Sequence, residues 1–229
     1  MCGVLAIYSQ SRIEDRHEKA ALLMLDSMAR RGPDISRKIK VNDRLLLGHT
    51  RLRVASLSPA ADQPKSYVKR DLHISFNGEI FNQSELKKQL GGALSAVPDL
   101  SEAEIILALY EKYGQGCFAR LEGQFALILY DGAQDRLILA RDPFGICPLY
   151  YMAHGGTHYM ASSVRAIVGA LSEVSFNPDL QAVDQFLLLR YVLAPKTIVK
   201  EIQQVCPGEV VIFEQQQSVR KRYWMIGQD

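Results

Sequence analysis

The sequence predicts an α+β fold in which antiparallel sheets pack against a small number of helices. Short strand-like stretches follow one another in runs, and residues 72–76 show the two-residue alternation of a half-buried strand. A few helix-length segments interrupt these runs, an order of elements typical of the α+β class. No repeat, low-complexity segment or flexible linker divides the chain, so we expect residues 1–229 to form a single domain.

The composition excludes several classes of function. Apolar residues make up 48% of the chain and charged residues 23%, which is ordinary for a globular protein with a substantial core. The net charge of +2 gives no electrostatic footprint for nucleic acid, and no apolar run approaches the roughly 18 residues of a membrane span. We expect a cytoplasmic protein without a nucleic-acid or membrane partner.

The four cysteines are scattered and show no Cys-x-x-Cys spacing. This pattern disfavours both a zinc site and a disulfide framework. We therefore expect no metal and no cofactor.

The first third of the chain predicts strands around one helix. Residues 4–8 form an apolar strand, and residues 15–30 form a helix with one apolar stripe that Gly32-Pro33 ends. Three further strands are expected, over residues 35–41, over residues 44–57 with a break near Arg51, and over residues 71–76.

Two capping boxes begin the next helices. Asn82 followed by Glu85 opens a helix that Gly91 closes, and Ser101 followed by Glu104 opens a second that reaches Gly114. Residues 91–100 between them predict a loop. The remaining expected elements are strands at 124–130, 136–140, 149–152, 158–161, 209–213 and 219–224, and helices at 163–171 and 179–190.

Cys2 is the first candidate for chemistry. If Met1 is removed, one residue carries both a thiol and a free α-amine, whose reference pKa of about 8 allows it to accept the thiol proton. A cysteine at this position can equally be a small buried residue without a catalytic role.

Asn77-Gly78 allows two interpretations. The pair is a strong hairpin signal, but only Glu79-Ile80-Phe81 would remain for the second strand before the helix cap at Asn82. In the alternative interpretation, the Asn77 side-chain amide and the Gly78 N–H donate to a developing negative oxygen.

Arg51, Glu79 and Glu102 form a candidate amino-acid clamp. Arg51 follows an apolar strand, and its guanidinium could hold a carboxylate with two hydrogen bonds. Two acids close to it would hold an α-ammonium group. Each of the three could instead be a solvated surface residue, and Glu102 also suits the start of its helix.

Six motifs in order then resemble one known family. They are Met1-Cys2-Gly3, Arg31-Gly32-Pro33-Asp34, His49-Thr50-Arg51-Leu52, Asn77-Gly78-Glu79-Ile80-Phe81-Asn82, Leu121-Glu122-Gly123-Gln124-Phe125-Ala126 and Arg141-Asp142-Pro143-Phe144-Gly145. Together they resemble the class II glutamine amidotransferase, or glutaminase, domain of the N-terminal nucleophile hydrolases. The resemblance covers almost the whole chain and implies a four-layer αββα sandwich. The segment from Pro195 to Trp224 is similar to the asparagine synthetase branch.

The resemblance implies hydrolysis of glutamine to glutamate and ammonia. Cys2 would attack the side-chain amide and form a thioester, while Asn77 and Gly78 would form the oxyanion hole. Arg51 would hold the substrate carboxylate and Glu79 its ammonium group, with Leu52 and Val54 lining the pocket.

Three departures from the family pattern bear on this interpretation. Glu102 stands where the family usually has Asp, which moves a carboxylate by roughly 1 Å and could weaken glutamine binding. Cys147 stands where the family commonly has Lys, which we interpret as loss of a surface or interdomain charge. No Ser-Gly-Gly-x-Asp-Ser pyrophosphate loop follows, so we expect ammonia to reach a separate ATP-dependent synthetase subunit or a missing C-terminal synthetase domain. The alternative is a non-catalytic or weakly active interaction domain that retains the fold.

Overall fold

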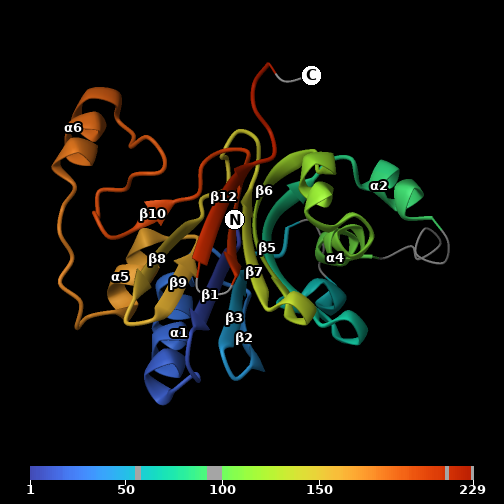
Figure 1. The fold of residues 1–229 in the computed structure, drawn as a ribbon, viewed down its shortest axis with the longest axis horizontal. Helices are drawn as coiled ribbons and strands as arrows, with labels where there is room; N and C mark the ends of the chain where they lie inside the picture. The colour runs from blue at the N-terminus through green and yellow to red at the C-terminus, as the bar shows by residue number, and fades with distance from the viewer. Residues whose placement is uncertain (55–57, 92–99, 215–216, 228–229) are drawn as a thin grey trace.

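The chain folds into four layers, two antiparallel sheets face to face with helices on both outer sides (Figure 1). A computed structural model describes residues 1–54, 58–91, 100–214 and 217–227. The α+β class and the αββα sandwich predicted from the sequence are confirmed by this arrangement.

The first sheet contains the N-terminal strand at its centre. Its strand order is β10-β8-β9-β1-β3-β2, and β1 pairs antiparallel with both β3 and β9. The strands are β1 (Gly3–Ser9), β2 (Ile35–Asn42), β3 (Leu45–Arg51), β8 (Tyr150–His154), β9 (Thr157–Ala161) and β10 (Gln203–Gln204).

The second sheet has the strand order β12-β11-β7-β6-β5-β4. Its strands are β4 (Lys65–Tyr67), β5 (Leu72–Ile80), β6 (Gly123–Asp131), β7 (Arg136–Arg141), β11 (Glu209–Glu214) and β12 (Gln217–Arg222). Adjacent pairs in this sheet are antiparallel, including the long β5–β6 pair that extends to the site described below.

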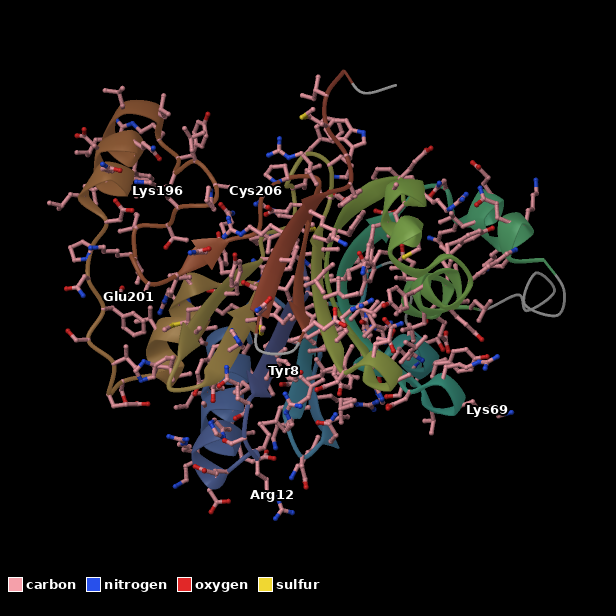
Figure 2. All side chains as sticks on the ribbon, in the orientation of Figure 1. Tyr8, Arg12, Lys69, Lys196, Glu201 and Cys206 are labelled. Atoms are coloured by element: carbon pink, nitrogen blue, oxygen red, sulfur yellow. The ribbon has the colours of Figure 1, made fainter. Side chains whose placement is uncertain are left out.

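The helices cover the two outer faces. Helices α1 (Asp15–Ser27) and α5 (Val164–Ala170) pack on the first sheet, and α2 (Gln83–Leu90) and α4 (Glu102–Tyr113) pack on the second. Helix α6 (Leu180–Leu189) projects near the edge of the first sheet, with an ion pair of 3.5 Å between Lys196 and Asp179 close to its start (Figures 1 and 2). Short 3₁₀ turns η1 (Pro59–Ala61), η2 (Val68–Arg70), η3 (Gly114–Arg120) and η4 (Gly132–Gln134) connect the elements.

The apolar core has three layers, one between the two sheets and one between each sheet and its helices. Side-chain alternation in the strands explains this arrangement. In β1, Val4 and Ala6 point into the core between the sheets, while Leu5 and Ile7 point toward α1 and α5. Because both faces of this strand are covered, it is apolar throughout. Tyr8 closes the inner layer, where its hydroxyl donates to Asp135 Oδ1 at 2.9 Å and links the two sheets (Figure 2).

Asn77-Gly78 does not form a hairpin turn. Strand β5 runs through both residues, with Asn77 opposite Ala126 and Gly78 opposite Phe125 of β6. Gly78 has φ +155°, and a Cβ atom there would lie 2.1 Å from the Gln124 carbonyl oxygen. The need for glycine thus arises from close strand pairing, so the hairpin interpretation is wrong.

Most other expected elements are present with shifted ends. The first helix ends at Ser27 instead of Arg30, and β3 ends at Arg51, where the break was expected. The expected strand residues 55–57 and the loop residues 92–99 lie outside the described part of the chain. The short strands β4 and β10 were not predicted. No helix in the described part of the chain is long and apolar enough to cross a membrane.

Candidate active site

A cavity of about 550 Å³ opens where β3 and β5 end, beside Cys2 and the start of α4. Seven of the eight site residues predicted from the sequence line it, namely Cys2, Arg51, Leu52, Val54, Gly78, Glu79 and Glu102. These residues are separated by up to 100 positions in the chain, so the fold brings site residues from different motifs into one cavity.

Cys2 lies against the backbone that leaves β3. The Leu52 N–H donates to Cys2 Sγ at 3.4 Å, and Sγ lies 3.8 Å from the Leu52 carbonyl oxygen. The Arg31 Nε–H donates to the Cys2 carbonyl at 3.2 Å. The Cys2 main chain and thiol are thus both held, and the thiol borders the cavity.

The Arg31-Gly32-Pro33-Asp34 motif packs against the same strand end. A Cβ on Gly32 would lie 2.3 Å from the Thr50 carbonyl carbon and oxygen, so only glycine permits this close approach. Asp34 accepts the Arg53 N–H at 2.7 Å, and its own N–H donates to the Arg51 carbonyl at 3.1 Å. The motif therefore fixes both Cys2 and the chain after Arg51.

Asn77, the eighth predicted residue, is buried in β5 one position before Gly78. Its side chain is 3% exposed, and its Nδ2 donor has no hydrogen-bond partner among the described residues. Burying an amide donor without a partner is costly, so this donor needs an explanation, and a ligand that supplies an acceptor is one.

Arg51 lines the cavity and is anchored from behind. It is 5% exposed, its Nη1 donates to the Ser58 carbonyl at 2.9 Å, and it forms an ion pair with Asp62. Burial alone would raise the pKa of Asp62, but the hydrogen bond from Arg51 and the charges of Arg37, Arg51 and Arg53 outweigh it and lower this pKa. The Asp62 carboxylate is thus ionised.

Glu79 and Glu102 approach the cavity from β5 and from the first turn of α4. Glu102 Oε1 accepts the Ile80 N–H at 2.6 Å and Gln83 Nε2 at 3.2 Å. Burial raises the pKa of Glu102; the Ile80 hydrogen bond opposes the shift and the neighbouring Glu79 charge adds to it. Two carboxylates close together provide an attractive position for a cation.

Sequence reasoning missed His49, Asp62 and Gln63. Gln63 lines the cavity and pairs with the Phe76 backbone, donating to its carbonyl at 3.0 Å and accepting its N–H at 2.7 Å. His49 also lines it and lies 3.1 Å from the same carbonyl through Nε2, while its buried Nδ1 has no partner in the described structure. Asp62 and Gln63 lie in a loop without periodicity, so only an unusual charged residue beside Pro59 and Pro64 could have indicated them.

The structure corrects our interpretation of Cys147. We expected the loss of a surface or interdomain charge, but this side chain is 2% exposed and packs in the core between the sheets. Burial raises the pKa of the Cys147 thiol to about 11, with the nearby Asp142 charge adding to the shift. The thiol therefore contributes to packing between the sheets, and its position is not a surface position.

A comparison with protein families places almost the whole chain in one domain family. The model of the glutamine amidotransferase domain family matches residues 1–224. The chain belongs to this family. A glutamine amidotransferase domain of the asparagine synthetase type is consistent with its curated relatives.

Three of these relatives illustrate the similarity. The chain is 34% identical over 178 residues to amidase chry2 of Gibberella zeae and 29% identical over 210 residues to glutamine-hydrolysing asparagine synthetase 1 of Bacillus subtilis. It is 34% identical over 174 residues to the glutamine-hydrolysing asparagine synthetase B of Escherichia coli. The matches cover 73%, 91% and 73% of this chain and 26%, 33% and 30% of the relatives. The chain thus spans about a third or less of their length.

Solved structures share the fold of the amidotransferase domain. The Bacillus subtilis glutamine phosphoribosylpyrophosphate amidotransferase complexed with ADP and GMP superposes with a TM-score of 0.69 at 18% identity, covering 98% of this chain and 50% of that one. A glutamine aminotransferase class-II domain protein from Silicibacter pomeroyi gives a TM-score of 0.51 at 12% identity, covering 96% and 97% of the two chains. At these identities the likeness concerns the fold alone.

Proposed function

We propose that this domain hydrolyses glutamine to glutamate and ammonia through a thioester at Cys2. The observation that carries the proposal is the single cavity that Cys2 shares with Arg51, Gly78, Glu79 and Glu102. A nucleophile, an oxyanion site and an amino-acid clamp in one cavity are the parts that amide hydrolysis of a free amino acid requires.

The chemistry begins after Met1 has been removed, and Met1 is 59% exposed and accessible to a peptidase. The free amine of Cys2 accepts the thiol proton, and the sulfur attacks the carboxamide carbon of glutamine. The Asn77 Nδ2 donor and the Gly78 N–H stabilise the negative oxygen of the tetrahedral intermediate. The C–N bond then breaks, the leaving nitrogen takes the proton and departs as ammonia, and water opens the thioester to release glutamate.

The other residues that line the cavity orient the substrate. Arg51 binds the α-carboxylate of glutamine, Glu79 and Glu102 bind its α-ammonium group, and Leu52 and Val54 contact its aliphatic part. A guanidinium matched to a carboxylate and two acids matched to an ammonium favour a zwitterionic amino acid over a neutral amide.

The test is glutamate release and covalent labelling by protein whose intact mass shows that Met1 is absent. We expect 6-diazo-5-oxo-norleucine, a glutamine-like electrophile, to label one site stoichiometrically and peptide mapping to place it at Cys2. Cys2→Ala should abolish both labelling and glutamate release. Cys206→Ala is the matched control, since Cys206 does not line the cavity, and it should retain both. Glutamate release by the Cys2→Ala variant would overturn the proposal.

The ammonia acceptor is proposed to be an ATP-dependent synthetase, as a separate subunit or a further domain. Support comes from the relatives named as glutamine-hydrolysing asparagine synthetases, of which this chain matches about a third. Titrating the domain with a candidate synthetase should raise the rate of glutamate release and yield the aminated product from glutamine. With Cys2→Ala, the same mixture should form product from ammonium only. A glutamate release rate that stays unchanged with an otherwise active synthetase would count against transfer to it.

One observation favours a weakly active interaction domain as the second candidate. The Glu102 carboxylate already accepts hydrogen bonds from the Ile80 N–H and from Gln83, so part of the clamp is engaged within the protein. The labelling and glutamate-release experiments separate the two candidates, because a non-catalytic domain leaves Cys2 unlabelled and a weakly active one releases glutamate only slowly.

A further inference from the structure

Asp62 is the centre of a cationic cluster behind the cavity. It follows the turn η1 and is 4% exposed, and its carboxylate forms an ion pair with Arg51. Arg37 Nη2 of β2 lies 3.2 Å from Asp62 Oδ2, and Arg53 Nη2 lies 3.6 Å from Asp62 Oδ1. Three arginines from two adjacent strand segments therefore converge on one buried acid.

The cluster keeps a positive charge after internal pairing. Three guanidinium groups surround the Asp62 carboxylate, and a further acid, Asp34, accepts the backbone N–H of Arg53 at 2.7 Å. Even with both acids ionised, the arginines are in excess. A carboxylate that enters the cavity beside Arg51 thus meets a favourable potential.

Only one member of the cluster faces the cavity. Of the described residues that line it, Arg51 is one, whereas Arg37, Arg53 and Asp62 are not among them. Asp62 therefore acts on the cavity through Arg51. A long arginine side chain has many rotamers, and a fixed partner orients its planar group before a ligand arrives.

On the basis of the proposed glutamine hydrolysis, we propose that Asp62 is a positioning residue that orients Arg51 and thereby determines specificity for a substrate with a free α-carboxylate. Asp62 does not contact the substrate, and nothing in the bond-making steps passes through it. Its removal should weaken recognition of the carboxylate and leave the reactivity of Cys2 unchanged.

The experiment compares Asp62→Asn with wild type on two substrates, glutamine and its α-carboxamide analogue, which lacks the carboxylate. We expect Asp62→Asn to raise KM for glutamine by about tenfold, since a displaced guanidinium loses carboxylate contacts, with kcat almost unchanged. For the carboxamide analogue, kcat/KM should change by less than about twofold, because Arg51 has no carboxylate to bind there. A purely structural role for Asp62 would lower activity on both substrates alike.

Two further variants support the comparison. Asp43→Asn is the matched control, because Asp43 pairs with Arg12 and Lys40 on the surface and lies outside the cavity lining, and it should behave as wild type. Asp62→Glu keeps the buried charge and should fold even if Asp62→Asn does not. It should raise KM for glutamine while sparing the carboxamide analogue, as expected for a displaced Arg51.

The outcomes separate this inference from the proposed function. If wild type releases glutamate but both Asp62 variants keep the wild-type preference for glutamine, the positioning role is wrong and the function stands. A lower KM for glutamine in Asp62→Asn would show that Asp62 competes with the substrate for Arg51, which also overturns the role. If wild type neither releases glutamate nor reacts with 6-diazo-5-oxo-norleucine, the function fails and the positioning role fails with it.

Discussion

Two buried arginine–aspartate pairs in this domain make opposite use of the same chemical groups. Arg141 is the last residue of β7 and Asp142 is its neighbour in the chain, and the guanidinium and the carboxylate each bond to backbone groups. Asp142 accepts N–H groups of Phe125, Phe144, Ile146 and Cys147 at 3.0–3.2 Å, and Arg141 donates to the carbonyls of Gly145, Cys147 and Val205. The Arg51–Asp62 pair instead lies at the end of β3, where Arg51 borders the cavity.

The difference teaches that a strong sequence motif need not mark chemistry. Arg141-Asp142-Pro143-Phe144-Gly145 is one of the six family motifs, but its charged side chains bond to backbone groups of their own loop and of the neighbouring residues Phe125 and Val205. Asp62 belongs to none of those motifs, although it holds the arginine that faces the cavity. Changes to the first pair should therefore affect stability, and changes to the second should affect substrate recognition.

Asp142→Ala should have the largest effect and test the first half of this comparison. It leaves four backbone N–H groups without their acceptor and the Arg141 guanidinium without its neighbouring charge, so we expect a loss of about 3 to 5 kcal/mol in the free energy of unfolding. The melting temperature should fall by roughly 10 °C. Urea unfolding measures this, with Asp43→Ala as a surface control expected within about 0.5 kcal/mol of wild type. A loss below about 1 kcal/mol would show that the loop does not depend on its aspartate.

Asn77→Ala should lower the rate, with much less effect on stability. Its Nδ2 donor has no partner in the described structure, so the folded domain loses no Nδ2 hydrogen bond with it. We expect kcat for glutamine hydrolysis to fall by about 10²- to 10³-fold, as when one oxyanion donor is removed. Steady-state kinetics and thermal unfolding measure the two effects.

Asn82→Ala is the matched control for Asn77. The Asn82 amide donates to the Arg120 carbonyl at 2.9 Å and accepts the Glu122 N–H at 3.2 Å, and Asn82 is not among the residues that line the cavity. It should lower stability and leave kcat near wild type. If the two asparagines exchanged these effects, Asn77 would be structural and the oxyanion assignment would be wrong.

Asn77 also shows how far the sequence could predict the site. Local pattern favoured a hairpin at Asn77-Gly78, because this dipeptide is a turn signal when considered alone. The long pairing of β5 with β6 overrides that signal, and it depends on contacts between residues about 50 positions apart. Residue types and motif order were sufficient to identify seven residues that line the cavity. They were not sufficient to find His49, Gln63 or Asp62, because these residues come together only when β2, β3 and a loop meet.

The layers of the fold were easier to predict than the ends of its elements. The Ser101–Glu104 capping box and the continuous apolar run of β1 depend on neighbouring residues, so their signals are visible in the sequence. The capping box predicted at Asn82 is wrong: α2 begins after Asn82, but the Asn82 side chain bonds to the Arg120 carbonyl and the Glu122 N–H and does not cap the helix. Cys147 was misjudged for the opposite reason, since its burial depends on two sheets packing face to face. Strand β10 contains two residues, too few for any periodicity.

His49 should give the domain a stability that depends on pH. Burial lowers the pKa of His49 to about 4, the hydrogen bond to the Phe76 carbonyl opposes the shift, and the Arg51 charge adds to it. The unfolded chain protonates this residue near pH 6.5, so between about pH 6.5 and 4 it binds more protons than the folded domain. The free energy of unfolding should therefore fall as the pH is lowered through this window, by at most about 3 kcal/mol from His49.

The measurement is urea unfolding from pH 7 to pH 4 for wild type and His49→Gln. His17 and His158 also have pKa values lowered mainly by burial, so they contribute to the slope in both proteins. The difference between the two slopes isolates His49. Parallel pH profiles would show that His49 is protonated in the folded domain or that its ring is accessible to water.

Glu102→Asp should have the smallest effect, and it tests whether the length of the Glu102 side chain matters for glutamine binding. Glu102 Oε1 accepts the Ile80 N–H at 2.6 Å, and the shorter aspartate would withdraw the carboxylate by roughly 1 Å from that donor. We expect KM for glutamine to rise by about three- to tenfold while kcat changes little. Glu104→Asp is the matched control, because Glu104 caps the same helix turn through Ser101 without lining the cavity. A lower KM in Glu102→Asp would mean that Glu102, at a position where the family usually has aspartate, weakens glutamine binding. The hydrogen bond from the Ile80 N–H would then stabilise the fold and have no part in substrate recognition.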